Sequence, residues 1–286
     1  MQQPSIVLLI PYFGKWPAWF EFFLISCQFN TSIQWIIYTD CPIPENSPDN
    51  VKYKQISFKD YKIMVSDKLG INFNPDNPYK LCDLKPALGF IHEDDIKSYD
   101  FWGFSDIDLV YGDLRQYYTA ERLSKYDLYS THSRRVSGHF CLIRNNKKMR
   151  EAFKLMKNWQ IRLADNTHHA LDEGAFSRIF IRHKNFPKYL FNFFSTLNPW
   201  RRNSEFIEAF STPNAGVAWI DGSYNFPVLW QWRSGKLTND LTGEREYPYF
   251  HFYGWKKDAW VNSVSITKSF QNISCFYISQ FGIEAQ

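Results

Sequence analysis

The stretch Ile6–Ile10, IVLLI, is a short and continuously apolar run rich in β-branched residues, which is typical of a buried parallel strand. A turn at Pro11–Gly14 follows it, and the apolar residues of Trp16–Asn30 then recur at helical spacing. Trp35–Tyr38 has the character of a second buried strand, and the alternating segment Val51–Ser57 that of a third. Strand, helix and strand, with polar residues where the strands end, predict the opening of a doubly wound nucleotide-binding fold.

The sequence beyond these elements continues to alternate between strands and helices. Residues 60–80 are rich in Asn, Asp and Pro and predict a loop. The elements that we expect after it are a helix at Leu84–Ile91, strands at Phe101–Ser105, Asp127–Thr131 and Phe140–Arg144, and helices at Lys147–Ala164 and Asp172–Ile181. After Phe186 the aromatic density rises and the pattern becomes irregular. A chain of 286 residues with this pattern predicts one α/β domain with a mostly parallel central sheet and an aromatic-rich C-terminal extension.

Aromatic residues are the anomaly of the composition, because 11 Trp, 17 Tyr and 26 Phe make up 19% of the chain. They suit stacking against sugar rings or nucleobases, and they equally suit a coding bias toward Phe and Tyr. The net charge of +4, without a long run of Lys or Arg, argues against a nucleic-acid partner. The mild positive balance is compatible with an anionic substrate such as a nucleotide diphosphate, or with an anionic membrane surface.

The cysteines and the N-terminal residues bear on the compartment. The five cysteines are scattered and form no C-x-x-C pair, so the sequence indicates neither a disulfide framework nor a zinc site. The first residues lack the basic and apolar regions of a signal peptide, and no stretch of about 18 uncharged apolar residues occurs. We therefore expect a cytoplasmic, soluble protein, with peripheral attachment to the cytoplasmic face of a membrane as an open alternative.

The segment Phe101–Asp113, FWGFSDIDLVYGD, contains the most specific chemical signal. A hydrophobic strand ends there and delivers two carboxylates, Asp106 and Asp108, one residue apart. In an extended segment residues i and i+2 point the same way, so both carboxylates can face one cation. Hard divalent cations prefer such oxygen ligands and keep positions open for substrate phosphates. An Asp-x-Asp pair alone is usually a solvated acidic loop, but its place after a buried strand favours a metal site.

A second segment near the C-terminal end, His251–Lys257, reads HFYGWKK. The neutral imidazole of His251 could complete the coordination of the metal, and Lys256 or Lys257 could meet a diphosphate as a point charge. Taken alone, the segment is more readily interpreted as an aromatic loop with an incidental histidine.

Together, the Asp-x-Asp pair and the His-Phe-x-Gly-x-x-Lys pattern resemble the metal and diphosphate motifs of GT-A glycosyltransferases, especially the glycogenin and bacterial lipopolysaccharide galactosyltransferase group. Pro11–Gly14 and Lys80–Pro86 also look like segments of an uncharacterised bacterial family whose members tend to lie among capsule and O-antigen assembly genes; that likeness spans residues 5–260. The chain departs from the motif where Asp258 follows Lys257 in place of the usual proline. It therefore stays open which of the two lysines contacts phosphate.

The resemblance implies an enzyme that moves a sugar from a nucleotide-sugar donor, most simply a UDP-sugar, to a growing surface polysaccharide or lipid-linked oligosaccharide. Its metal, Mn²⁺ or Mg²⁺, would be held by Asp106, Asp108 and His251. The resemblance also implies a GT-A domain at residues 1–260, in which 1–115 bind the nucleotide sugar and 116–260 face the acceptor. Residues 261–286 would form a C-terminal tail.

Further positions follow from the resemblance. Asp40 would lie near the uridine or ribose of the donor, with turn capping as the alternative role. Asp83 and Lys85 would contact the donor sugar and nucleotide, with a surface ion pair as the alternative. Gly138 and His139 would line the pocket for the donor sugar and acceptor, although His139 could instead be a hydrogen-bonded core histidine.

Asp172 and Glu173 open a predicted helix, where capping and the helix dipole alone would favour carboxylates. The resemblance places the acceptor-side acidic residue there. In an inverting enzyme such a carboxylate removes the proton of the acceptor hydroxyl, and in a retaining enzyme it stabilises the reacting sugar. The stereochemical outcome stays open.

Three alternatives remain at the level of the sequence. Paired carboxylates and a cation also serve other metal-dependent phosphoryl or nucleotidyl transferases, although no P-loop motif is present. A non-catalytic carbohydrate-binding protein would use the aromatic residues for stacking and the acidic pair for structure. The tail Trp255–Phe281 either lies on a membrane that carries a lipid-linked acceptor or packs against the domain.

Overall fold

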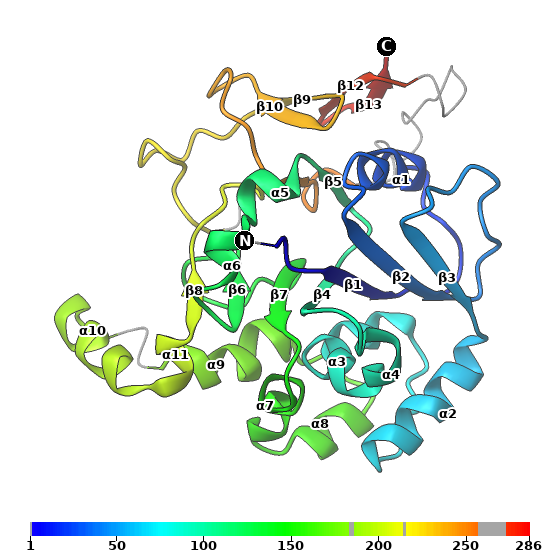
Figure 1. Cartoon of the computed structure of the whole chain (residues 1–286), viewed down its shortest axis with the longest axis vertical. Helices are drawn as coiled ribbons and strands as arrows, with labels where there is room; N and C mark the ends of the chain where they lie inside the picture. Colours follow the sequence, from blue (N-terminus) through cyan, green and yellow to red (C-terminus); the bar gives the residue numbers. More distant parts are fainter. Residues whose placement is uncertain (1, 183–185, 214–215, 257–272) are drawn as a thin grey trace.

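The computed structural model describes residues 2–182, 186–213, 216–256 and 273–286 (Figure 1). A seven-stranded sheet runs through the middle of the molecule, and a four-stranded sheet lies beyond α1 (Phe20–Gln28), the helix that covers one face of the central sheet. Within the described residues no helix combines the length and the apolar character needed to cross a membrane.

The central sheet has the strand order β3-β2-β1-β4-β7-β6-β8. Its strands are β1 (Ile6–Pro11), β2 (Ile33–Thr39), β3 (Val51–Gln55), β4 (Phe101–Ser105), β6 (Leu128–Ser130), β7 (Phe140–Arg144) and β8 (Ser204–Phe206). Strands β3, β2, β1 and β4 are parallel neighbours, as are β6 and β8, whereas β7 runs antiparallel to both β4 and β6. The predicted fold class, α/β with a mostly parallel central sheet, is therefore confirmed.

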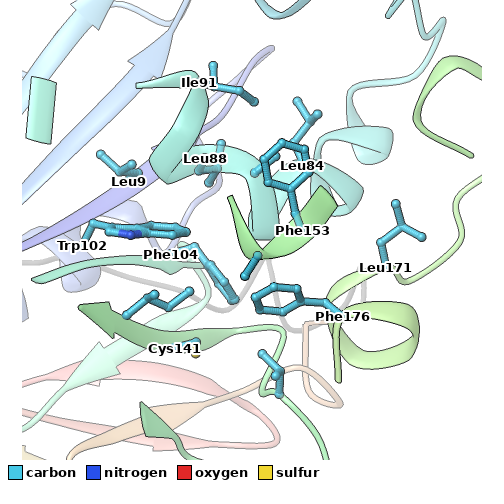
Figure 2. Packing of buried hydrophobic residues seen from close by; sticks show 14 of the residues in the cluster. Leu9, Leu84, Leu88, Ile91, Trp102, Phe104, Cys141, Phe153, Leu171 and Phe176 are labelled. Atoms are coloured by element: carbon cyan, nitrogen blue, oxygen red, sulfur yellow. The ribbon is translucent and has the colours of Figure 1, made fainter. Parts of the chain in front are cut away.

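Helices cover both faces of this sheet (Figure 1). The α-helices are α1 (Phe20–Gln28), α2 (Phe58–Leu69), α3 (Leu88–Ile91), α4 (Glu93–Ile96), α5 (Leu114–Tyr117), α6 (Ala120–Leu123), α7 (Lys147–Arg150), α8 (Trp159–Ala164), α9 (Ser177–Phe180), α10 (Lys188–Leu197) and α11 (Pro199–Arg202). Side chains alternate along β1, so Leu8 packs with α1 on one face and Leu9 packs on the other. Figure 2 shows Leu9 on that second face, in the cluster that contains Leu84 and Leu88.

The single long helix expected at Lys147–Ala164 is wrong. The structure divides it into α7, a 3₁₀ turn at Ala152–Leu155 and α8. Met156 is extended, and Asn158, which precedes α8, has a positive φ of 55°. An asparagine tolerates this left-handed conformation better than most residues, so the backbone can turn at this position and bury Phe153 and Leu163 in the same core.

Two other predicted helices differ in type. Leu84–Ile91 is the end of a 3₁₀ segment, Pro78–Ala87, followed by α3. Asp172–Ile181 begins as a π-helical turn, Asp172–Phe176, and continues as α9. The wider turn places one extra residue before α9, and such turns often occur at functional sites.

The loop expected at residues 60–80 is partly wrong, because α2 occupies Phe58–Leu69. Ser57 caps this helix by accepting a hydrogen bond from the backbone N–H of Asp60, and the helix ends at Gly70, which has a left-handed φ of 64°. A serine, an acidic residue three positions later and a terminal glycine are the usual signals of a helix, and they are present in the sequence.

The four-stranded sheet, β10-β9-β12-β13, packs an aromatic-rich cluster against α1. Its strands are β9 (Leu229–Arg233), β10 (Lys236–Asn239), β12 (Cys275–Ser279) and β13 (Gly282–Ala285). Trp230 and Trp232 are fully buried in one cluster with Phe22 and Ile25 of α1. The irregular pattern after Phe186 does not predict this sheet. The described part of the predicted tail contributes β12 and β13, and the boundary at residue 260 stays a prediction.

Candidate functional site

The acidic pair lies at the carboxyl end of β4, in the turn that leads to β5 (Leu109–Tyr111). Asp106 is fixed to the neighbouring strand because its backbone N–H donates to the carbonyl of His139 at 3.0 Å. Asp108 is almost completely buried, whereas Asp106 is partly exposed. The carboxyl ends of parallel strands are where open α/β sheets bind ligands.

A two-stranded sheet joins this turn to the C-terminal half of the chain. Strand β11 (Tyr249–His251) pairs antiparallel with β5, and His251 lies opposite Leu109. The backbone N–H of Phe252 donates to the carbonyl of Asp108 at 3.4 Å, which continues the pairing. The register therefore sets His251 beside Asp108, although the two residues are far apart in the sequence.

Asp106, Asp108 and His251 each offer a ligand atom, and these atoms lie within 4.8 Å of one another. Nε2 of His251 is 3.4 Å from Oδ2 of Asp108. Two carboxylate oxygens and one imidazole nitrogen suit Mn²⁺ or Mg²⁺, and three protein ligands leave positions for substrate oxygens. The donor set therefore fits the divalent cation that the resemblance implies.

Two lysines contact the acidic pair. Lys85 Nζ lies 2.6 Å from Asp106 Oδ1 and donates to the carbonyl of Gly138 at 2.8 Å. Lys256 forms an ion pair with Oδ2 of Asp108. Burial alone would lower the pKa of Lys85, but the Asp106 carboxylate outweighs it and holds that pKa well above its ordinary value. Lys257, the other predicted phosphate contact, lies outside the described residues.

His139 is part of a hydrogen-bonded layer behind His251. The two imidazoles stack with a centroid separation of 4.2 Å. His139 Nε2 lies 2.8 Å from the hydroxyl of Tyr249, and the hydroxyl of Thr212 lies 3.2 Å from His139 Nε2 and 3.3 Å from His251 Nδ1. Burial and the neighbouring His251 hold the pKa of His139 well below its ordinary value, so its imidazole is neutral.

Another part of the cavity wall carries Asp172 and Glu173. Burial of the neighbouring Leu171 and Phe176 in the core anchors the π-helical turn on both sides (Figure 2). Burial raises the pKa of Asp172 to about 6; the nearby Lys85 opposes this change, and Glu173 adds to it. Glu173 is partly exposed and faces the guanidinium of Arg135, with Arg135 Nε 3.3 Å from Glu173 Oε2.

Gly138, two residues before β7, lies directly against the side chains of Asp172 and Glu173. A Cβ atom at Gly138 would lie 2.8 Å from Oδ2 of Asp172 and 3.1 Å from Oε1 of Glu173. Only a glycine leaves both carboxylates in their present positions. The predicted residues Gly138, Asp172 and Glu173 are thus brought together.

Asp83 and Asp40 lie elsewhere. Asp83 is fully buried, pairs with Lys80 at 3.1 Å and accepts hydrogen bonds from the backbone N–H groups of His169 and Leu171. It therefore holds the loop that leads to Asp172. The exposed Asp40 accepts a hydrogen bond from the backbone N–H of Gly14 at 2.8 Å. Neither side chain lines the cavity described next.

A cavity of about 700 Å³ connects the acidic pair to the Asp172 wall. The predicted residues Lys85, Asp106, Asp108, Gly138, His139, Asp172, Glu173, His251 and Lys256 all line it. Residues of this wall that the sequence patterns do not single out are Trp19, Tyr79, Arg135, Thr212 and Tyr253. Tyr253 is a variable position of the His251–Lys257 motif; the other four stand in no recognisable motif, and the fold alone brings them to the cavity.

A family model described as "Family of unknown function (DUF6625)" matches residues 8–285. The chain belongs to this family. Membership of the family assigns no activity, and no curated protein matches the sequence.

Among solved structures, the DUF6625 chain is similar to a galactosyltransferase, LgtC, in complex with donor and acceptor sugar analogs, at 12% identity and a TM-score of 0.33 over 60% of this chain and 71% of that one. It is also similar to mouse xyloside xylosyltransferase 1, at 8% identity and a TM-score of 0.36 over 73% and 87% of the two chains. A third similar structure is the glycosyltransferase GlyE of Streptococcus pneumoniae TIGR4, at 12% identity and a TM-score of 0.32 over 73% and 46%. Such loose superpositions do not identify an activity, so the argument for function rests on the site.

Proposed function

We propose that this DUF6625 protein is a metal-dependent glycosyltransferase that moves a sugar from a nucleotide-sugar donor, a UDP-sugar, to a saccharide acceptor. One observation carries the proposal: Asp106, Asp108 and His251 converge at a cavity of about 700 Å³ that the buried carboxyl of Asp172 also lines. The motifs of the acidic pair and of His251 resemble those of GT-A enzymes. This arrangement suits a sugar-transfer reaction, because the metal site would bind the donor diphosphate and Asp172 would face the acceptor.

The donor side consists of the acidic pair, His251 and the two lysines. A divalent cation at Asp106, Asp108 and His251 would supply the positive charge that stabilises a departing nucleotide diphosphate. Lys256 Nζ pairs with the carboxylate of Asp108, so it would stand beside the phosphate of a donor bound at this cation. Lys85 is held by Asp106 and the carbonyl of Gly138, so it keeps Asp106 in place.

The acceptor side is the wall of Asp172 and Glu173. Because the pKa of Asp172 is about 6, its carboxylate is mostly ionised at neutral pH and remains basic enough to accept a proton. A base at this position would take the proton of the acceptor hydroxyl in an inverting reaction. The same carboxylate beside the donor sugar would stabilise positive charge on that sugar in a retaining reaction.

We further propose that the acceptor belongs to a growing surface polysaccharide or a lipid-linked oligosaccharide. The resemblance of Pro11–Gly14 and Lys80–Pro86 to a bacterial family associated with capsule and O-antigen genes supports this assignment. The exposed residues Tyr79 and Tyr253 at the cavity offer rings on which a sugar can stack.

The test is thermal melting with Mn²⁺ and a panel of UDP, GDP and CMP, followed by a release assay with the matching nucleotide sugars. A ligand at about 100 times its dissociation constant stabilises a protein by about 2.7 kcal/mol, so a specific nucleotide gives a clear shift of the melting temperature. We expect UDP to stabilise the protein only when Mn²⁺ is present. Asp108→Asn should abolish this shift, whereas Asp67→Asn, an exposed position on α2, should keep it.

Two results would count against the proposal. Either no nucleotide changes the melting temperature, or Asp108→Asn binds Mn²⁺ and UDP as the wild type does. Binding of a free saccharide without any nucleotide effect would favour a carbohydrate-binding protein, and release of phosphate without sugar transfer would favour another phosphoryl transferase.

A further inference from the structure

A second cavity, of about 390 Å³, lies between α8, α9, α11 and the 3₁₀ turn at Ala152–Leu155. Four cationic side chains line it, those of Lys157, Arg162, Arg178 and Arg182, and none of the acidic residues that the structure describes does. In the described part of the chain, none of the four has an ion-pair partner. We call these four residues the basic groove.

Helix α10 presents large apolar side chains to solvent. Tyr189, Phe193 and Leu197 have exposed fractions of 72%, 58% and 65%. They are four residues apart, and residues at this spacing lie on the same face of a helix. We call them the α10 stripe. Single exposed apolar residues are ordinary, but three in a row on one helix face indicate a surface that contacts a partner.

The stripe and the groove belong to adjoining elements. Helix α10 packs against α11, and α11 packs against α9. The side-chain amide of Asn198, between α10 and α11, donates to the carbonyls of Ile179 and Phe180 at 3.0 and 3.1 Å. Figure 1 shows α10 at the margin of the molecule, beside α11 and α9.

The charges of this region point to the nature of the partner. The sequence from Gly174 to Ser204 contains no Asp or Glu, and Arg202, at the end of α11, is also exposed. A surface with unpaired cations and no interspersed carboxylates complements a partner of uniform negative charge. An aromatic and aliphatic helix face next to cations is the usual composition of a helix that lies in a membrane interface.

We propose that the α10 stripe and the basic groove dock the protein on a bilayer that contains anionic phospholipids. The stripe enters the boundary between headgroups and acyl chains, and the four cations contact lipid phosphates. This surface differs from the aromatic tail Trp255–Phe281 considered in the sequence analysis. The proposal does not rest on the proposed transferase activity, since membrane docking is measurable without metal or nucleotide.

The experiment is flotation of the full-length protein with phosphatidylcholine vesicles and with vesicles in which phosphatidylglycerol replaces part of the phosphatidylcholine. We expect binding to the anionic vesicles only. Each cation near such a surface contributes about a fivefold gain in affinity, so Arg178→Gln/Arg182→Gln should weaken binding about 25-fold. About 0.5 M NaCl should weaken the binding of the wild type, because salt screens these contacts.

Matched variants separate docking from general effects. Lys52→Gln/Lys59→Gln removes two exposed cations on β3 and α2, and should bind as the wild type does. Phe193→Ser/Leu197→Ser should lose most of its binding, whereas Ile63→Ser, a half-exposed apolar position on α2, should keep it. Circular dichroism verifies that each variant is folded. If a groove variant fails to fold, the exposed stripe variant decides the question.

Three outcomes would overturn the proposal: no binding to anionic vesicles, equal binding to neutral and anionic vesicles, or unchanged binding of both the stripe and the groove variants. Retention of inorganic phosphate in the groove without vesicle binding would also overturn it. Nucleotide-dependent melting is measured on the same variants and should stay unchanged, so a failure of membrane docking is distinguishable from a failure of the transferase proposal.

Discussion

Nε2 of His251 lies 3.4 Å from Oδ2 of Asp108 because the strands that carry the two residues pair with each other in a sheet of their own. The other ring nitrogen, Nδ1, faces the hydroxyl of Thr212 at 3.3 Å. An imidazole that ligates a metal through Nε2 carries its proton on Nδ1, and a hydrogen-bond acceptor there fixes both the tautomer and the ring orientation. In that tautomer the hydroxyl oxygen of Thr212 accepts the Nδ1 proton.

Thr212→Val should therefore lower the affinity for Mn²⁺ in the presence of UDP by about 10- to 100-fold, with little change in stability. Valine has almost the shape of threonine but lacks the hydroxyl. Calorimetric titration measures the affinity directly, without an activity assay. Thr212→Ser retains the hydroxyl and should restore binding; equal affinities for the Val and Ser variants would contradict this role for Thr212.

Asp172 should make the stability of the protein depend on pH. Burial raises its pKa from 3.8 to about 6, so the folded state binds this proton more tightly than the unfolded state. The stabilisation from this proton is complete below about pH 4 and is lost as the pH rises through about 6. Asp172→Asn should thus be more stable than the wild type above about pH 6, by up to about 3 kcal/mol.

Urea unfolding at a series of pH values measures this difference, with Asp67→Asn as the control at an exposed position. If the enzyme uses the ionised carboxylate, turnover of the wild type should also rise with pH through about 6. If the free energies of unfolding of the wild type and Asp172→Asn changed with pH in parallel, the pKa of Asp172 would be the same in the folded and unfolded states.

Gly138 and Gly103 form a matched pair for the effect of one added methyl group. At Gly138 the new Cβ would meet two carboxylates, at 2.8 and 3.1 Å, and these side chains can rotate away. At Gly103, in β4, it would lie 2.4 Å from the backbone oxygen of Cys141, which cannot move without separating two strands.

Gly103→Ala should therefore lower the free energy of unfolding by about 1–3 kcal/mol, and Gly138→Ala by less. Gly138→Ala should instead reduce sugar transfer, because Asp172 and Glu173 move. Chemical denaturation and the release assay measure the two effects separately. A Gly138→Ala variant with full activity would mean that the positions of these carboxylates are unimportant.

Asp83 and Asp40, both expected at the donor site, should differ strongly in their effect on stability. Asp83→Ala leaves the buried ammonium group of Lys80 with the partly exposed Asp165, and it removes the acceptor of the backbone N–H groups of His169 and Leu171. Removal of one partner from a buried ion pair usually costs about 3–5 kcal/mol. Asp40→Ala removes one exposed hydrogen bond to Gly14 and should cost less than about 1.5 kcal/mol. Thermal unfolding of the two variants measures both values, and similar losses would contradict the positions described for them.

The central sheet was predictable because its buried strands are continuous apolar runs, as in β1 and β4. The break of the helix at Asn158 was not predictable. Apolar residues continue at helical spacing through this position, and only tertiary packing selects its left-handed backbone. The alternation of the buried Trp230 and Trp232 with less buried neighbours in β9 did carry a strand signal, but it stood inside an irregular segment with other aromatic residues such as Tyr224 and Phe226.

The candidate site was predictable only where residues stand in motifs. The acidic pair and His251 have recognisable neighbours in the sequence, whereas Thr212 and Arg135 do not. The contact between Asp108 and His251 depends on the pairing of β5 with β11, which joins distant parts of the chain. No local pattern contains that information.

The two lysines at the acidic pair have a consequence for the order in which ligands bind. Asp106 and Asp108 are balanced by Lys85 and Lys256, so these four side chains carry no net charge before any ligand arrives. A divalent cation entering alone would add two positive charges beside two ammonium groups. A cation that enters with a nucleotide diphosphate brings its own counter-charge and releases Lys256 to a phosphate. Each ligand should therefore raise the affinity for the other by the same factor, and between turnovers the protein should hold little metal of its own.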